Sequence, residues 1–155
     1  MIKLLVFLIL VTQFVFTQTA KDLIGSWQAV PYVAAGYDET YTFNEDGTFT
    51  FHYNQMDCAK REISYGGSWV LKGKTIELNI TYSEYLAGGR YQPPTGSCGS
   101  DSELVDASYV KKIIIPFERE TLKLSGYNSE DIDGFERTSM LINNRKYYMF
   151  SKFEF

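Results

Sequence analysis

Apolar and polar residues alternate along most of this chain with a period of two. In TFTFHY, residues 48–53, the side chains of Phe49, Phe51 and Tyr53 fall on one face. TIELNITY, residues 75–82, repeats the pattern. Because successive side chains of a strand point to opposite faces, this spacing predicts strands with one buried and one wet face. After the first 20 residues no stretch has the spacing of a long amphipathic helix, so we expect an all-β protein.

Short polar turns separate the predicted strands. NEDG at residues 44–47, KGK at 72–74, ERE at 118–120 and Asn143-Asn144 each lie between two alternating segments and predict hairpins. With a first strand in GSWQAVPY, residues 25–32, the count is about nine. Sequential hairpins form an antiparallel up-and-down meander, and closure into a β-barrel of about 8–9 strands removes its exposed edges. A two-sheet sandwich needs longer crossover links than these turns.

Two segments are predicted to be long loops. Residues 83–107 contain Pro93-Pro94 and Cys98, and residues 127–133 are acidic. Long loops in compact domains often carry binding sites, so the first is a candidate contact surface.

The first 20 residues are predicted to be a secretory signal peptide. Lys3 precedes an apolar run over residues 4–11, and polar and small residues follow it. Cleavage is expected after Thr17 or Ala20, which leaves residues 21–155 as a single domain. A retained membrane anchor is the alternative, but two glutamines interrupt the run and a span needs about 20 apolar residues. We therefore expect a secreted, periplasmic or cell-envelope protein with no membrane span after signal removal.

Two cysteines, Cys58 and Cys98, are predicted to form a disulfide. An even number of cysteines in an exported chain favours a bridge over free thiols. The bridge would hold the predicted loop at residues 83–107 across one end of the barrel.

Charge and residue types argue against several functions. The net charge is −4 and the basic residues do not cluster, so nucleic acid is not an expected partner. His52 is the only histidine, and no serine lies in a nucleophile-elbow pattern. Two thiols and one histidine make an incomplete zinc site. We expect no enzyme activity, no catalytic residues, no metal and no cofactor.

The opening Gly25-x-Trp27 resembles the motif that begins the first strand of the calycin superfamily, which includes lipocalins and fatty-acid-binding proteins. YTFNEDGTFTF and then GGSWVLKGKTIEL, at residues 41–51 and 66–78, resemble small secreted bacterial lipocalin-like domains. The resemblance is best over residues 23–82. It implies a barrel in which Trp27 covers one end above Gly25 and packs against an arginine near the last strands, for which Arg137 and Arg145 are the candidates.

Alternation also predicts which side chains point into the barrel. The candidate ligand-binding residues are Tyr41, Phe43, Phe49, Phe51, Tyr53, Arg145 and Tyr147. Arg145-Lys146-Tyr147 resembles the Arg-x-Tyr of fatty-acid-binding proteins, where the pair holds a carboxylate. An inward arginine needs a partner because leaving it unpaired is costly. That partner would be a ligand carboxylate, a loop Asp or Glu, or Trp27.

Two functions follow from this reading. The first is a carrier, expected to be a monomer, that binds a small apolar or amphipathic molecule in the barrel. The second is a barrel filled by its own side chains that contacts another protein, as an inhibitor or interaction module, through residues 83–107. Barrels of about eight strands are wide enough for either arrangement.

Overall fold

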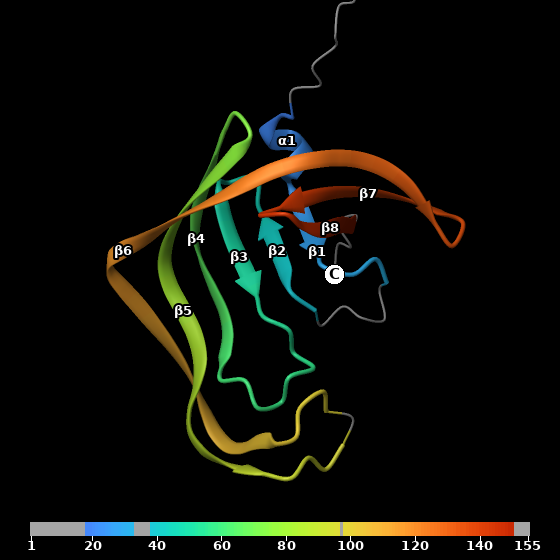
Figure 1. The fold of residues 1–155 in the computed structure, drawn as a ribbon. Coiled ribbons are helices and arrows are strands. Elements are labelled where there is room, and N and C mark those ends of the chain that lie inside the picture. Colours follow the sequence, from blue (N-terminus) through green and yellow to red (C-terminus); the bar gives the residue numbers. More distant parts are fainter. Residues whose placement is uncertain (1–17, 33–37, 97, 151–155) are drawn as a thin grey trace, which may run out of the picture.

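The protein is an all-β chain whose single sheet closes on itself (Figure 1). The computed structural model describes residues 18–32, 38–96 and 98–150. Eight antiparallel strands follow one another in chain order, and β1 also pairs with β8. The elements are α1 (Ala20–Leu23), β1 (Gly25–Gln28), β2 (Thr40–Phe43), β3 (Thr48–His52), β4 (Glu62–Lys72), β5 (Thr75–Gln92), β6 (Glu103–Ile132), β7 (Phe135–Ile142) and β8 (Arg145–Phe150). The predicted fold class, an antiparallel up-and-down meander, is confirmed at this level.

Strand β6 is one continuous strand of 30 residues, so the predicted turn at residues 118–120 is wrong. Glu120 pairs with Leu78 of β5 in the middle of the sheet. The segment ERE lacks the Gly, Asn or Asp residues that take up the positive φ of a tight hairpin turn. Two predicted strands therefore merge into one, and the sheet has eight strands.

The predicted loop at residues 83–107 is also largely wrong. Strand β5 continues to Gln92 and β6 begins at Glu103, which leaves only residues 93–102 as the connection. The extended hairpin bends beneath one end of the closed sheet (Figure 1). Cys58 and Cys98 form a disulfide with a Cα–Cα distance of 5.8 Å, so the predicted bridge ties the β3–β4 connection to the hairpin tip.

Residues 127–132, predicted to be part of an acidic loop, lie in β6 instead. The turn to β7 is Asp133-Gly134, where φ is 52° and 83°. The predicted turn at Asn143-Asn144 is confirmed, with φ of 50° and 67°. Both turns use residue types that tolerate the left-handed region.

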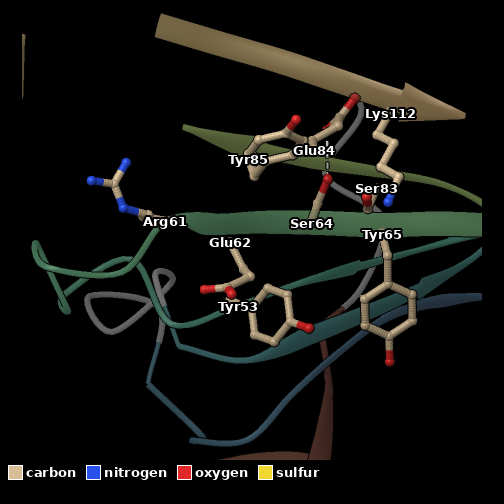
Figure 2. Close-up of a pocket in the computed structure, with 9 residues that line it drawn as sticks. All are labelled: Tyr53, Arg61, Glu62, Ser64, Tyr65, Ser83, Glu84, Tyr85 and Lys112. Atoms are coloured by element: carbon tan, nitrogen blue, oxygen red, sulfur yellow. Dashed lines mark hydrogen bonds between the residues drawn. The ribbon is translucent and has the colours of Figure 1, made fainter. Parts of the chain in front are cut away.

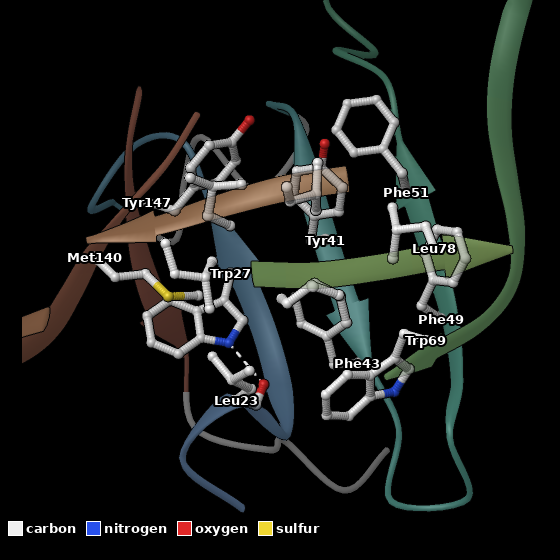
Figure 3. Close-up of a cluster of buried hydrophobic side chains, with 14 of the residues drawn as sticks. Leu23, Trp27, Tyr41, Phe43, Phe49, Phe51, Trp69, Leu78, Met140 and Tyr147 are labelled. Atoms are coloured by element: carbon white, nitrogen blue, oxygen red, sulfur yellow. Dashed lines mark hydrogen bonds between the residues drawn. The ribbon is translucent and has the colours of Figure 1, made fainter. Parts of the chain in front are cut away.

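The core fills the closed sheet with large apolar side chains (Figure 3). Alternate residues of the strands contribute to it, as the period of two predicts. One end, which we call the tryptophan end, contains Leu23, Trp27, Phe43 and Trp69. The opposite end, which we call the tyrosine end, is lined by Tyr41, Tyr53, Tyr65 and Tyr147. Aliphatic residues of β5, β6 and β7 complete the core.

Candidate ligand-binding site at the tyrosine end

Trp27 closes the tryptophan end, where its side chain is fully buried. Its Nε1 donates a hydrogen bond of 2.8 Å to the Leu23 carbonyl oxygen, and its ring centroid lies 6.2 Å from that of Tyr127. Gly25, two residues earlier, has a φ of 132°, which favours glycine. The arginine that the resemblance places on Trp27 is found elsewhere: the Arg137 guanidinium lies over Phe150, at 5.2 Å from its ring centroid.

The aromatic residues predicted to face inward meet inside the sheet. Five of them, Tyr41, Phe43, Phe49, Phe51 and Tyr147, are at most 6% exposed, and Tyr53 is half-buried. The ring centroid of Tyr41 lies 4.6 Å from that of Phe51 and 5.5 Å from that of Tyr147. The structure thus brings these residues together, while their contact with a ligand stays a prediction.

Arg145 lies at the rim of the tyrosine end, not within the core. About half of its side chain is exposed, and it forms ion pairs with Glu39 and Asp38 (3.8 Å to the latter). Its guanidinium also lies 5.8 Å from the ring centroid of Tyr147. Loop Asp and Glu residues were one of the three partners expected for this arginine, and Asp38 and Glu39 take that role.

Glu120 is a site residue that sequence reasoning missed. It lies two residues before Leu122 and four before Leu124, both buried in the core, and it is opposite the buried Leu78. These registers place Glu120 on the inward face of β6, where it is half-buried. The hydroxyl of Tyr65 donates a hydrogen bond of 3.3 Å to its carboxylate. Extending the alternation backward from Leu124 and Leu122, instead of placing a turn at ERE, would have found it.

The tyrosines around Glu120 are neutral hydrogen-bonding groups at physiological pH. Burial raises the pKa of Tyr65 and of Tyr41 far above the usual value, and the negative charge of Glu120 adds to both shifts. Burial also raises the pKa of Tyr147 to about 12. The interior therefore changes along its length from purely apolar side chains to a cluster of hydroxyls around one carboxylate.

A cleft of about 340 Å³ adjoins this cluster (Figure 2). It is lined by Tyr53, Arg61, Glu62, Ser64, Tyr65, Ser83, Glu84, Tyr85 and Lys112. Tyr53 and Tyr65 belong to both the cleft and the tyrosine end, so the cleft continues the interior toward solvent. Figure 2 shows Glu62 beside Tyr53, on the same side of β4 as Tyr65.

Polar contacts order the other wall of the cleft. The Ser64 hydroxyl donates to Glu84 at 2.5 Å, and the Tyr109 hydroxyl donates to it at 2.7 Å. These hydrogen bonds, with the nearby Lys111, lower the pKa of Glu84. Glu84 thus has three polar partners within the protein: Ser64, Tyr109 and Lys111.

Among residues 18–32, 38–96 and 98–150, no three or more His, Cys, Asp or Glu side chains gather where they would hold a metal ion. In the same part of the chain no helix is long and apolar enough to cross a bilayer. Comparison of the chain with family models, with curated proteins and with solved structures gives no match. The candidate site therefore rests on the geometry of this structure.

Proposed function

We propose that this protein is an exported, lipocalin-like β-barrel that binds a small amphipathic molecule at its tyrosine end without transforming it. The observation that carries the proposal is the two-ended interior. One end is apolar and covered by Trp27, and the other has tyrosine hydroxyls that continue into a cleft of about 340 Å³. Ligand sites typically combine apolar walls with a few polar groups in cavities of about 300 Å³ or more.

Two further features support the barrel family and the location. Gly25 and Trp27 occupy the first strand and close one end, as the resemblance to lipocalin-like domains implies. The disulfide between Cys58 and Cys98 is the kind of bridge that forms in oxidising compartments, in agreement with the predicted signal peptide.

The proposal is tested by filling the cleft. Ser83 lines it, so Ser83→Trp should abolish saturable binding of an apolar fluorescent dye by the wild-type protein. Thr121→Trp on the exposed outer side of β6 is the matched control and should leave binding unchanged. Circular dichroism establishes that both variants fold. Native mass spectrometry of protein purified from its own host would identify the ligand. Equal dye binding by wild type and Ser83→Trp would contradict the proposal.

A second candidate function is contact with another protein, and a specific surface favours it. Ile113, Ile115 and Phe117 of β6 are 61%, 87% and 48% exposed, which is unusual for large apolar side chains. A photo-crosslinking residue at position 115 should then give a discrete adduct in the host, and one at position 121 should not. The absence of such an adduct at position 115 would count against this function.

A further inference from the structure

The charges at the tyrosine end distinguish between classes of amphipathic ligand, given the proposed function. Glu120 is inward-facing and half-buried. Among the described side chains, its one hydrogen-bond donor is Tyr65, and no Lys or Arg forms a salt bridge with it. A carboxylate that is withdrawn from water is stabilised when a cation pairs with it.

The aromatic rings of the same end already accept cations from the protein itself. The ammonium of Lys60 lies 4.4 Å from the ring centroid of Tyr53, and the guanidinium of Arg145 lies over Tyr147. Faces of aromatic rings attract cations through their quadrupole, and cages of such rings bind ammonium groups. Tyrosines around a carboxylate therefore suit an ammonium head group.

The basic residues near the cleft are mostly engaged elsewhere. Arg145 is paired with Asp38 and Glu39. Arg61 donates to the carbonyl oxygens of Leu86 and Gly88, at 3.1 and 2.7 Å.

Lys112 is a cation that would favour an anionic ligand, such as a fatty-acid carboxylate. It lines the cleft and is exposed, and its strand partner is Ser83. A fatty-acid carboxylate would meet Lys112 in the cleft, but it would also meet the exposed carboxylate of Glu62 there and the half-buried carboxylate of Glu120 beside Tyr65. An ammonium would meet the two carboxylates and the tyrosine rings.

We infer that the tyrosine end selects a cationic amphiphile, with an ammonium head group placed between Glu120 and the surrounding tyrosines and an alkyl chain against the tyrosine rings that line the cleft. This inference rests on the proposed function. It reverses the carboxylate ligand that Arg145-x-Tyr147 suggested from the sequence.

Three probes with the same alkyl chain isolate the head group: octylammonium, octanol and octanoate. We expect isothermal titration calorimetry of the full mature protein at low salt to give the order octylammonium, then octanol, then octanoate, with about a tenfold preference for ammonium over alcohol. Added salt should reduce that preference, because it screens partly exposed charges.

Two charge-matched variants test the residue assignment. Glu120→Gln keeps the shape of the side chain and removes its charge. It should therefore lower the affinity for octylammonium to that for octanol. Glu77→Gln removes the same charge from the outer face of β5, where the Glu77 side chain is 44% exposed and pairs with Lys72, and should keep the full preference. Thermal unfolding of both variants shows whether the fold is intact.

The outcomes separate the two claims. Octanoate binding as tightly as octylammonium, or an unchanged preference in folded Glu120→Gln, would overturn the inference and leave the binding function standing. Failure of all three probes to bind would overturn the proposed function, and the inference with it.

Discussion

Trp27 is completely buried, and its indole N–H donates a hydrogen bond to Leu23. Both features determine how much stability its replacement should remove. Trp27→Phe removes part of the indole and leaves the Leu23 carbonyl oxygen without its donor. We expect the free energy of unfolding to fall by about 2 kcal/mol. Chemical denaturation measures it. The comparison is Trp69→Phe, since Trp69 is slightly exposed and its hydrogen bond to Asn44 is longer, at 3.2 Å. A larger loss for Trp69→Phe would contradict this ranking.

The buried tyrosines predict how stability depends on alkaline pH. The pKa of Tyr147 rises from 10.0 to about 12 on folding, and burial raises those of Tyr41, Tyr53 and Tyr65 as well. The folded state thus keeps protons that the unfolded state loses. The stabilisation is complete below about pH 10 and is lost as the pH rises toward 12.

Denaturation curves at several pH values test this dependence. The free energy of unfolding should decline above about pH 10, and Tyr147→Phe should show a shallower decline. Tyrosinate absorbance provides the check in the folded protein. If all 12 tyrosines titrated together near pH 10, the buried cluster would not exist as described.

At the scale of single residues, period-two alternation predicted most of the interior. It located Tyr41, Phe43, Phe49, Phe51 and Tyr147, because inward positions on short strands need only local periodicity. It placed Arg145 inward as well, yet the side chain turns to Asp38 and Glu39 at the rim. Long polar side chains at strand ends reach water, and a pattern of residue types does not specify that direction.

At the scale of strands and turns, the strand ends that could be predicted are those followed by residues typical of tight turns. Asp46-Gly47, Gly73-Lys74 and Asn143-Asn144 connect strands as expected, because these residues adopt turn conformations readily. The length of β5 and β6 was not predictable from the same signals. Gly88 and Gly89 both have positive φ within the pairing of β5 with β6, so glycines there mark irregularities in a strand and not its end.

Strands β4 and β5 approach each other closely at Gly67, where the strand register shifts. A Cβ there would lie 1.9 Å from the Asn79 carbonyl oxygen. Gly67→Ala should therefore lower the free energy of unfolding by about 3 kcal/mol. Gly96→Ala, where nothing lies within 4 Å of the added carbon, should change it little. Similar unfolding midpoints for the two variants would contradict the close approach.

The disulfide joins the β3–β4 connection to the hairpin tip, next to backbone hydrogen bonds from Gly99 to the Met56 carbonyl oxygen and from Leu104 to the Cys58 carbonyl oxygen. It closes a loop with a sequence separation of 40 residues, so replacing Cys58 and Cys98 by alanine should cost about 4 kcal/mol. We also expect faster protease cleavage between residues 93 and 102. Limited proteolysis with mass spectrometry locates the cuts. Unchanged cleavage in the double variant would show that the hairpin tip is held by other contacts.

For the whole molecule, sequential hairpins with short turns were sufficient to predict closure. Each strand pairs with the next, and the last pairs with the first. The tyrosine end was harder to predict, because it depends on β6 passing from β5 to β7 along its length. Glu120 lies in the part of β6 that pairs with β5 and meets Tyr65 of β4, and no local sequence signal marks a contact between residues 55 positions apart.

The most direct test of the two-ended interior is NMR mapping of the isotope-labelled protein with octylammonium. We predict saturable shift changes concentrated at Tyr41, Tyr65, Glu120 and Tyr147, with the Trp27 indole signal unchanged. Shift changes centred on the exposed outer side of β6, or spread evenly over the surface, would contradict the assignment of the site.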